Sequence, residues 1–470
     1  MNEDYNKQIA EMRSSIEEVL DAFKIGRTGD IKVTPGPTVT LFEFCVQSGV
    51  RASKIRNLKD EFCFALHTQN VRVIAPTERG TVGVEVPNRT RQDVPMIEML
   101  YSDEYMNTDM ELPLVLGRKV DNSIFMADLA RMPHLLVAGA TGMGKSVGLN
   151  VILSSLINKR KPSELKLVLV DPKQVEMSVY DKLTPYLAHL DGKPLIITDA
   201  SDAKDTLDAV IRLMESRYTL LKDAGVRNIQ DYNRTAAEPL PYYVVVIDEY
   251  GDLILSANDR EMERAICRIA QKARAVGIHM IISTQRPDAK IVTGNIKANF
   301  PTRIAFRTTT GTDSRVVLDR VGAERLTGRG DMIFFDGSPE NKRIQCAYVS
   351  TDEVVQLCND VCSEYPDIEP ALLPEEPKVE IPVQKTYRHL DKWSRDNIIE
   401  CHRYEYMPKR WMNWKMLCTD TEGIRLAQEL GILGEEGQYC TTGYSPEPAF
   451  PVLIRDKEEI IRRLDEWQGI

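Results

Sequence analysis

Between residues 114 and 350 the chain alternates short apolar runs with stretches of helical periodicity. The apolar runs are HLLVAGA, LKLVLVD, YYVVVIDE, GIHMIIST and TRIAFRT. Strands of this kind are buried on both faces, as in a mostly parallel sheet that helices cover on both sides. The pattern therefore predicts a doubly wound α/β core over residues 114–364.

Upstream of this core the pattern is different. VTPGPTVTLFEF predicts a turn and a strand, SKIRNLKDEFCFAL a helix, and VRVIAP and TVGVEVPN two strands in which apolar and polar residues alternate. Together with a preceding helix they predict a small αβ domain that ends near Asn88, with a tether to about Pro113, so that residues 1–113 precede the core. The preceding helix is expected over residues 4–25, where apolar side chains recur at helical spacing: Ile9, Met12, Ile16, Val19, Leu20 and Phe23.

Downstream of the core, residues 365–383 (YPDIEPALLPEEPKVEIPV) are rich in proline and glutamate. This composition predicts an extended linker. We expect a small third domain over residues 384–470, where helical and turn signals accompany the four tryptophans of the chain, Trp393, Trp411, Trp414 and Trp467.

The composition is ordinary for a globular protein, with 43% hydrophobic and 28% charged residues. The net charge of −10 argues against a protein that coats nucleic acid over its whole surface, although it is compatible with a small basic surface inside a channel. Nine scattered cysteines without a paired CxxC set argue against structural zinc and predict free thiols. The polar N-terminus and the lack of an apolar run of about 18–20 residues predict a cytoplasmic chain without a membrane span.

The first apolar run leads directly into a phosphate-binding motif. Residues 139–146 (GATGMGKS) fit GxxxxGK[ST], with a predicted strand before them and a predicted helix after them. Glycines let backbone N–H groups approach a phosphate, and the start of the helix adds partial positive charge. We expect Lys145 to contact the β- and γ-phosphates of ATP and the Ser146 hydroxyl to coordinate Mg²⁺. The expected nucleotide-binding residues are Gly139, Ala140, Thr141, Gly142, Met143, Gly144, Lys145, Ser146 and Val147.

A pair of acidic residues ends the strand YYVVVIDE. An acid at the carboxyl end of a strand can hold the metal and its water shell, and a neighbouring acid can polarise the attacking water. We assign Asp248 to Mg²⁺ and Glu249 to activation of water. Strands that end in solvated acids are common, but the position downstream of a phosphate loop favours the catalytic interpretation.

Two further segments carry candidate residues. The strand that ends in IISTQRP places Gln285 where it could detect the γ-phosphate, although a strand cap and a turn would give the same sequence. Residues 263–275 predict a helix with four cations, one of which a neighbouring subunit could offer to the transition state. Such charges usually form a solvated helix face, and the pattern alone does not choose among Arg264, Arg268, Lys272 and Arg274.

Several segments together resemble the FtsK/SpoIIIE family of DNA translocases, over about residues 1–350. They are GPTVTLFEF, VGVEVPN, RMPHLLVAGATGMGKSVGLN, VLVDPKQVEMSVYDKL, RYTLLKDAGVRNIQDYN, ARAVGIHMIISTQRPDAKIVTGNIKANFPTRIAFR and DSRVVLDRVGAERLTGRGDM. The resemblance implies a RecA-like P-loop motor that binds ATP and Mg²⁺ between the subunits of a homo-hexameric ring. It also implies that double-stranded DNA passes through the centre of this ring.

The resemblance adds roles for individual residues. Gln285 resembles the nucleotide-sensing glutamine of the family, and Arg274 resembles its arginine finger, which acts on the site of a neighbouring subunit. Lys145, Ser146, Asp248 and Glu249 keep the roles given above. The cations that resemble residues facing DNA in the pore are Arg286, Lys297 and Arg315; without the resemblance, they would be interpreted as ordinary surface charge.

Other features depart from the family's pattern. Septum-bound members begin with membrane spans and often end in a basic winged-helix module, and neither is recognisable here. Residues 384–470 hold 13 Lys/Arg and 15 Asp/Glu, so they lack the basic character of a DNA reader and are expected to bind a protein partner instead. A free-standing motor from a mobile element or phage is therefore the expectation.

Two alternatives stay open: a secretion- or conjugation-type motor that moves protein or single-stranded DNA, and a regulatory NTPase. The segments GNIKANFPTRIAFR and GRGDM favour duplex DNA over these alternatives.

Overall fold

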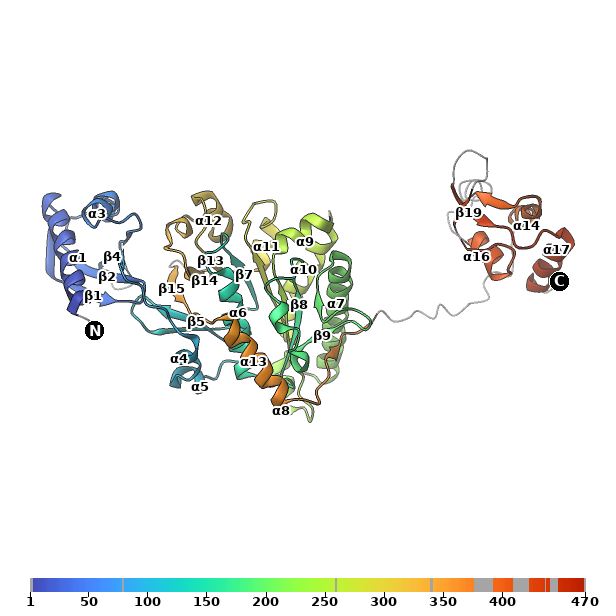
Figure 1. Cartoon of the computed structure of the whole chain (residues 1–470), viewed down its shortest axis with the longest axis horizontal. Helices are drawn as coiled ribbons and strands as arrows, with labels where there is room; N and C mark the ends of the chain where they lie inside the picture. Colours follow the sequence, from blue (N-terminus) through green and yellow to red (C-terminus); the bar gives the residue numbers. More distant parts are fainter. Residues whose placement is uncertain are drawn as a thin grey trace. The chain divides into compact units, whose positions relative to one another are not determined.

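The computed structural model describes residues 3–77, 80–257, 260–338, 341–375, 392–408, 422–435, 437–439 and 447–468. The chain forms two compact units, Met1–Glu376 and Pro377–Ile470, which we describe separately (Figure 1). Within the ranges just given, no helix combines the length and the apolar character needed to cross a membrane.

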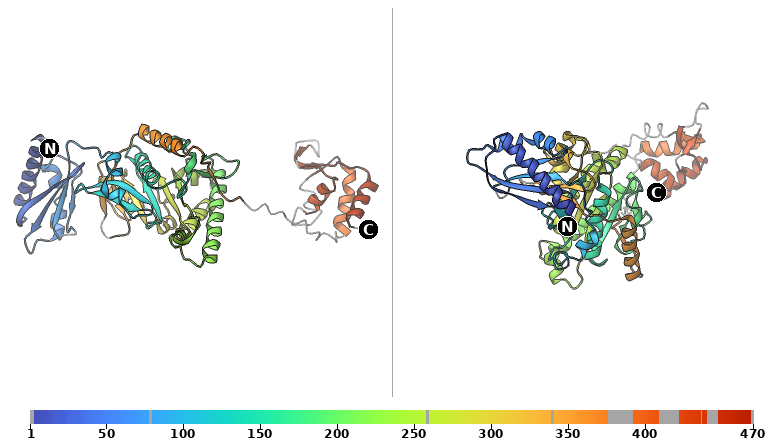
Figure 2. Two further views of the ribbon diagram at one scale, coloured as in Figure 1. Left: turned by 90° about the horizontal axis from the view of Figure 1, so that it is seen from below. Right: turned by 60° about the vertical axis from the view of Figure 1, so that its left-hand side comes forward.

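The first unit begins with α1 (Glu3–Ala22), which lies along one face of a four-stranded antiparallel sheet, the N-terminal sheet (Figure 2). Ile16 and Leu20 of α1 are fully buried in one apolar cluster with Phe42 of the sheet, so the expected amphipathic helix is confirmed. The other elements here are β1 (Arg27–Pro35), β2 (Val39–Val46), α2 (Ala52–Arg56), α3 (Lys59–Ala65), β3 (Arg72–Ile74) and β4 (Val82–Pro87), in the sheet order β1-β2-β4-β3.

A ten-stranded sheet, the central sheet, forms the larger part of the first unit. Its order is β10-β8-β11-β12-β7-β13-β14-β15-β5-β6. The strands from β10 to β13 pair in parallel, and those from β13 to β6 pair antiparallel. Their bounds are β5 (Pro113–Lys119), β6 (Ile124–Asp128), β7 (His134–Ala138), β8 (Leu165–Val170), β10 (Ile196–Ile197), β11 (Tyr242–Ile247), β12 (Ile278–Thr284), β13 (Thr302–Phe306), β14 (Asp331–Phe335) and β15 (Lys342–Cys346).

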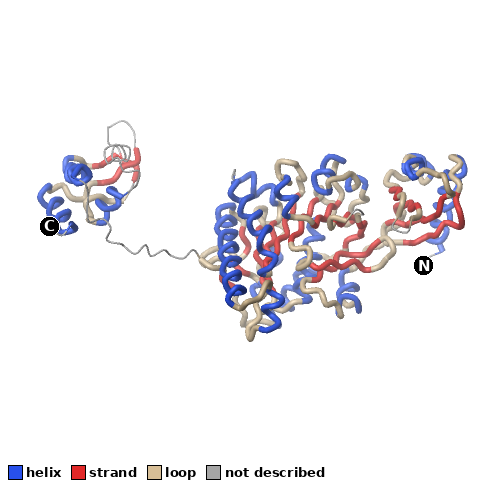
Figure 3. Tube along the Cα trace, turned by 180° about the vertical axis from the view of Figure 1, so that it is seen from behind, coloured by secondary structure: helices blue, strands red, loops and turns tan. Residues whose placement is uncertain are grey.

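Helices cover both faces of the central sheet because its strands are apolar on both faces. Along β11, Val244 and Val246 join one buried cluster, whereas Val245 and Ile247 join the other. This alternation follows from the two-residue period of a strand. The first cluster includes residues of α4 (Met96–Leu100), α5 (Asp103–Met106), α6 (Lys145–Lys159) and α13 (Thr351–Glu364). The second includes residues of α7 (Ala200–Asp223), α9 (Tyr250–Ala257), α10 (Arg260–Lys272), α11 (Gly294–Asn299) and α12 (Gly311–Leu318). Figure 3 shows the helices in blue packed around the red strands of this sheet. The architecture confirms the predicted RecA-like α/β class.

The five predicted core strands are all present, as β7, β8, β11, β12 and β13. Two segments differ from the expectation. The helix expected over residues 263–275 ends at Lys272 and continues as a 3₁₀ turn, Ala273–Val276, followed by Gly277 with a φ of 72°. Within the segment expected as linker, β16 (Ala371–Leu372) pairs with β9 (Ala188–His189), because Leu373 is buried against the core. Residues 376–383 of that segment lie outside the described ranges. A short helix, α8 (Ile229–Thr235), precedes β11.

The second unit has a small apolar core of its own, which includes Ile398, Phe450 and Leu464. Trp467 packs against this core, whereas Trp411 and Trp414 lie outside the described residues. The elements are α14 (Lys392–Glu400), β17 (Tyr406–Pro408), α16 (Glu422–Glu429), β18 (Gly437–Tyr439), β19 (Glu447–Pro451) and α17 (Lys457–Gln468), and the strands pair in the order β17-β19-β18.

Candidate functional site

The phosphate loop, residues 139–146, connects the end of β7 to the start of α6. Gly142 and Gly144 have φ values of 76° and 109°, a region that side chains disfavour. A Cβ atom at Gly144 would also lie 2.7 Å from the backbone nitrogen of Gly330. The sequence therefore needs glycine at position 144 for two reasons, the backbone conformation and the close approach of a second loop.

The lysine of this loop is held at the ends of two neighbouring strands. Lys145 Nζ lies 2.5 Å from Asp248 Oδ1, which follows β11, and donates a 2.9 Å hydrogen bond to Ser283 Oγ of β12. The Ser283 hydroxyl also donates to Asp248. All three side chains are buried, so each of the two charges is stabilised by the other and not by water. The structure thus brings the side chains of Lys145 and Asp248 together at the phosphate loop.

The residues assigned to Mg²⁺ fit a magnesium ion. Asp248 Oδ2 is buried and lacks a hydrogen-bond partner among the described residues. A buried carboxylate oxygen of this kind destabilises the fold unless a cation or a water molecule pairs with it. Ser146 lines the cavity described below, and its hydroxyl donates a 2.5 Å hydrogen bond to Glu176. Magnesium takes hard oxygen ligands and keeps several of its waters, so one hydroxyl and one carboxylate from the protein suffice.

Glu249 is fully buried next to Asp248, and its φ of 46° places it in the left-handed region. Backbone strain of this kind in a non-glycine residue is concentrated at functional sites. Its carboxylate accepts hydrogen bonds from the Thr284 hydroxyl at 3.0 Å and from the backbone N–H of Gln285 at 3.1 Å. The carboxylate is therefore fixed at the carboxyl end of β12, beside the phosphate loop that follows the adjacent β7.

Gln285 connects this acid to the phosphate loop. Its side-chain oxygen accepts a 2.7 Å hydrogen bond from the Thr141 hydroxyl, while its backbone N–H is bonded to Glu249. A single residue thus touches both the loop that would hold the phosphates and the acid that would activate water. This position is suited to a group that detects the γ-phosphate.

The loop after β8 supplies two residues that no local sequence pattern marks as functional, Lys173 and Glu176. Lys173 Nζ lies 3.3 Å from Glu249 Oε2 and 3.2 Å from Asp252 Oδ2. Partial burial disfavours its charge, but the hydrogen bond to Asp252 and the charges of Glu249 and Asp252 outweigh this and raise the pKa of Lys173. Glu176 accepts the Ser146 hydroxyl bond already described.

Asp171 holds this loop in shape. Its buried carboxylate accepts hydrogen bonds from a run of consecutive backbone N–H groups, those of residues 173–177. The only signal in the sequence was the segment VLVDPKQVEMSVYDKL, which contributed to the family resemblance without assigning roles to its charged residues.

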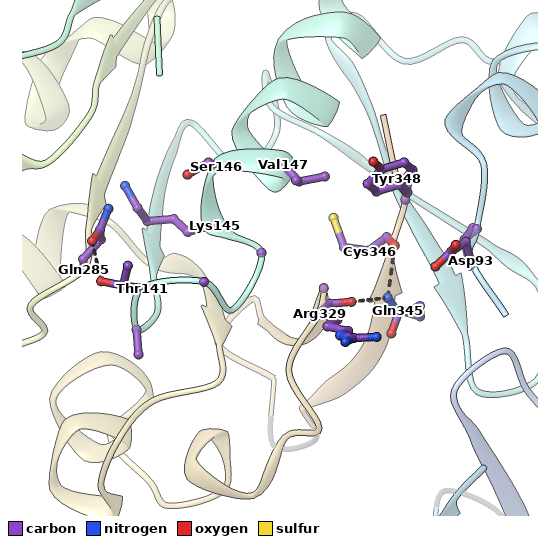
Figure 4. A pocket seen from close by; sticks show the side chains of 16 residues that line it. Asp93, Thr141, Lys145, Ser146, Val147, Gln285, Arg329, Gln345, Cys346 and Tyr348 are labelled. Atoms are coloured by element: carbon purple, nitrogen blue, oxygen red, sulfur yellow. Dashed lines mark hydrogen bonds between the residues drawn. The ribbon is translucent and has the colours of Figure 1, made fainter. Parts of the chain in front are cut away.

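A cavity of about 340 Å³ lies along the phosphate loop (Figure 4). Lys145, Ser146 and Gln285 line one end, and Tyr348, Cys346 and Asp93 line the other, with Val147 between them (Figure 4). The first end is polar and cationic and the second carries an aromatic ring, as a phosphate chain attached to a nucleoside would need. The full lining is Asp93, Val94, Ala140, Thr141, Gly142, Gly144, Lys145, Ser146, Val147, Gln285, Arg329, Gly330, Gln345, Cys346, Ala347 and Tyr348.

The structure separates Arg274 from this site. Arg274 is exposed on the 3₁₀ turn that precedes the amino end of β12, whereas the phosphate loop follows the carboxyl end of the adjacent parallel strand β7. A strand of five to seven residues spans roughly 17–23 Å. Arg274 therefore lies at the opposite edge of the sheet and cannot complete the site of its own chain.

The expected DNA-contacting cations lie on three elements after β12. Arg286 is exposed immediately after the strand, Lys297 lies on α11, and Arg315 is exposed on α12. Lys297 Nζ is held 2.6 Å from Asp319 Oδ1, and Asp319 also pairs with Arg303 of β13. Arg286 and Arg315 are therefore more accessible to a ligand than Lys297 is.

Two family models match the sequence. The one described as the FtsK/SpoIIIE family matches residues 96–289, and the one described as the FtsK alpha domain matches residues 1–88, so that together they cover more than half of the chain. The chain belongs to the FtsK/SpoIIIE family. The first match contains the phosphate loop and the acids after β11, and the second contains the N-terminal sheet.

Relatives within the FtsK/SpoIIIE family support the assignment. The DNA translocase FtsK of Chlorobaculum tepidum is 42% identical over 408 residues, which make up 85% of this chain and 50% of the relative. The DNA translocase SpoIIIE of Bacillus subtilis is 40% identical over 383 residues, or 79% of this chain and 48% of the relative. The chain thus spans about half the length of these two relatives.

Two solved structures share the α/β fold of this chain. The conjugation coupling protein TcpA of pCW3, in a monomer form with ATPγS, matches with a TM-score of 0.52 at 25% identity, over 76% of this chain and 99% of that one. EssC (ATPases 2 and 3) from Geobacillus thermodenitrificans matches with a TM-score of 0.50 at 16% identity, over 64% of this chain and 57% of that one.

Proposed function

We propose that this chain hydrolyses ATP at the cavity beside the phosphate loop and uses the energy to move double-stranded DNA. The observation that carries the proposal is the convergence of Lys145, Asp248 and Glu249 at the ends of adjacent parallel strands. This arrangement supplies a phosphate ligand, a metal ligand and a base within one site. The named relatives are DNA translocases, which supports DNA as the substrate.

In this mechanism the backbone N–H groups of the phosphate loop and Lys145 bind the phosphates. Ser146 and Asp248 would hold Mg²⁺, which would neutralise charge on the phosphate oxygens. Glu249 accepts the proton of the attacking water. Gln285 lies between Thr141 and Glu249, so it transmits the state of the γ-phosphate to the segment that begins at Arg286.

The far end of the cavity fits the nucleoside. The Tyr348 ring can stack on a base, and Asp93 can accept hydrogen bonds from ribose hydroxyls (Figure 4). The match to TcpA, whose structure holds ATPγS, supports an adenine nucleotide.

Hydrolysis is tested with Glu249→Gln, which keeps the size of the side chain and removes its basicity. We expect this variant to bind ATP with nearly unchanged affinity and to lose ATP hydrolysis by at least about 100-fold. Lys145→Ala should instead lose binding itself. Hydrolysis at the wild-type rate by Glu249→Gln would assign the activation of water to another group.

The ring is part of the same proposal. Because Arg274 lies at the opposite sheet edge from its own phosphate loop, it can complete the site of a neighbouring subunit, and a closed homo-hexamer supplies such a neighbour to every site. Arg286, Lys297 and Arg315 would then face duplex DNA in the pore. We place the protein in the cytoplasm, where the described cysteines, all free, would stay reduced.

One experiment separates this function from its alternatives. ATPase activity should rise with the length of duplex DNA, because a translocating motor hydrolyses ATP for as long as track lies ahead of it. Stimulation by single-stranded DNA or by a protein substrate alone would favour a conjugation- or secretion-type motor. A rate that no polymer changes would favour a regulatory NTPase.

For the second unit we propose a protein partner. Its near-balance of 13 basic and 15 acidic residues over residues 384–470 gives no net attraction for DNA phosphates. A chain that ends after Glu376 should keep DNA-stimulated ATPase activity. Sequence-selective binding of duplex DNA that disappears with this truncation would contradict the proposal and make the unit a DNA reader.

A further inference from the structure

A buried group of charges connects the N-terminal sheet to the central sheet. Arg343 of β15 lies with Nη1 2.7 Å from Glu85 Oε2 of β4 and with Nη2 2.7 Å from Asp331 Oδ2 of β14. Its Nε also donates a 3.0 Å bond to Asp331 Oδ1, so the pairing with Asp331 is bidentate. Each of these side chains is at most 4% exposed.

Charges at this depth are costly unless each is compensated. Burial alone would raise the pKa of Asp331, but the charge and the hydrogen bonds of Arg343 outweigh it and lower the pKa. Glu85 also has Arg72 of its own sheet at 3.4 Å. Removal of one partner from such a group leaves an uncompensated buried charge, whereas apolar side chains of similar size are often as stable. Stability alone therefore does not explain why charged residues occupy these positions.

Asp331 connects this buried group of charges to a loop. Its Oδ2 accepts bonds from the Thr327 backbone N–H at 2.7 Å and from the Thr327 hydroxyl at 2.8 Å. Thr327 begins the 327–330 loop, in which Gly328, Arg329 and Gly330 have φ values of 77°, 51° and 88°. The two glycines adopt positive φ at little cost, so the strain in this loop lies at Arg329, whose conformation neighbouring contacts must hold.

The 327–330 loop in turn contacts the phosphate loop. The backbone N–H of Gly330 donates a 3.0 Å bond to the carbonyl of Met143, and this is the loop that approaches Gly144 so closely that no Cβ atom fits. Arg91, which follows the N-terminal sheet, donates to the carbonyl of Thr327 at 3.2 Å and more weakly to that of Gly328 at 3.4 Å. Ion pairs and hydrogen bonds thus lead from Glu85 through Arg343 and Asp331 to Thr327, and the backbone of the 327–330 loop completes the path to Met143.

We propose that Arg343 is a positioning residue through which the N-terminal sheet holds the 327–330 loop against the phosphate loop, so that nucleotide affinity depends on Glu85. The inference rests on the proposed nucleotide site but not on hydrolysis or on DNA. It assigns the N-terminal sheet a part in building the ATP site.

The test measures the affinity of the full chain for ATPγS, together with its thermal unfolding midpoint. Glu85→Gln leaves Arg343 with Asp331 alone, and we expect the Kd for ATPγS to rise about tenfold, within the usual range of coupling between sites. Arg343→Lys keeps the charge and loses the fork that serves both acids. Arg343→Lys should raise the Kd for ATPγS by at least as much as Glu85→Gln. It also tests the proposal if Glu85→Gln does not fold.

Glu43→Gln is the matched control. Glu43 is another buried acid of the N-terminal sheet, on β2, and accepts a 3.0 Å bond from Thr81, which immediately precedes β4. We expect this variant to lower the unfolding midpoint while the Kd for ATPγS stays within twofold. An equal rise in Kd in Glu43→Gln and Glu85→Gln would show that general destabilisation causes the rise, and would overturn the proposal. The proposal would also be wrong if Glu85→Gln and Arg343→Lys lowered the unfolding midpoint and left the Kd for ATPγS unchanged.

Hydrogen exchange gives an independent measurement, because coupling between two sites is reciprocal. In the wild type, ATPγS should slow amide exchange in β4 and around Arg91 as well as at the phosphate loop. In Arg343→Lys at saturating ATPγS, the slowing of exchange that ATPγS causes should remain at the phosphate loop and disappear in β4. Wild-type protection confined to the phosphate loop would contradict the coupling. Failure of wild-type protein to bind ATPγS would instead refute the proposed function itself.

Discussion

Lys173 and Glu249 form an ion pair, with Nζ 3.3 Å from Oε2, although they lie on loops that follow different strands. Glu249 is buried and strained, and Lys173 is the cation that restrains its second oxygen. An acid that must face an attacking water needs its orientation held as well as its basicity. We infer that Lys173 positions Glu249 for proton transfer.

Replacement of this lysine tests the inference. Lys173→Met should lower the kcat of ATP hydrolysis about tenfold and leave KM for ATP nearly unchanged, because the phosphate ligands are intact and only the orientation of Glu249 is loosened. Lys173→Arg should restore part of the rate. The control is Lys182→Met, which removes an exposed lysine from the same connection between β8 and β9. Equal rates in Lys173→Met and the wild type would leave the ion pair without a catalytic role.

The sequence predicted the parts of this site that depend on local pattern. The phosphate loop is a contiguous motif, and Asp248 and Glu249 end a strand whose apolar run is unmistakable. Lys173 and Glu176 could not be assigned in this way, because an isolated charge in a loop is typical of a solvated surface. Their role depends on the fold of the loop around Asp171, which brings them to partners on other strands.

The antiparallel half of the central sheet was not predicted for a related reason. β14 and β15 contain Asp331 and Arg343, and charged residues in the middle of a sheet usually argue against a buried strand. They are buried because they compensate each other and because Glu85 lies opposite, 258 residues away in the sequence. The periodicity of apolar residues predicts which apolar side chains are buried. It cannot predict that a charged side chain is buried when its partner lies so far away in the sequence.

A pair of buried histidines makes stability depend on pH. Burial is the main cause that lowers the pKa of His134 to about 3 and of His279 to about 4, and the charge of Arg274 lowers both further. Their rings lie 6.3 Å apart at the amino ends of β7 and β12. The His134 Nδ1 accepts a bond from the Met280 backbone, and the His279 Nδ1 donates to the Pro133 carbonyl.

Because both folded pKa values lie below the value near 6.5 of an unfolded histidine, the unfolded chain binds more protons in acid. Stability is complete above about pH 6.5 and is lost as the pH falls towards 4, by up to about 1.4 kcal/mol per histidine and pH unit. Urea unfolding at pH 7.5 and pH 5.0 should show this loss. His279→Asn keeps a donor for the carbonyl and should reduce the difference, whereas His67→Asn at an exposed site should not. An identical loss in His279→Asn would exclude this histidine as its source.

The salt dependence of binding tests the DNA-facing cations. Removal of one cation that pairs with a DNA phosphate should reduce the slope of log K against log salt by about one unit. Arg286→Ala and Arg315→Ala should therefore flatten the slope, and Lys297→Ala should do so less because Asp319 already holds that lysine. Arg234→Ala, on α8 before the amino end of β11, is the control at the opposite sheet edge. If all three slopes equal that of the wild type, DNA follows another surface.

Arg274 tests the ring itself. Because the finger and the phosphate loop of one chain lie at opposite sheet edges, Arg274→Ala should lose most of the turnover, by roughly 10³-fold or more, and still bind ATP. Lys145→Ala should lose binding at its own site. Mixed rings of the two variants contain some interfaces with an intact Lys145 on one side and an intact Arg274 on the other, so ATPase activity should partly return in proportion to those interfaces. If rings shown to be mixed are as inactive as either parent, then Arg274 does not act on a neighbouring site, and its charge is one of the solvated cations of this region. Recovery that peaks at equal amounts of the two chains would support an ATP site that is shared between subunits.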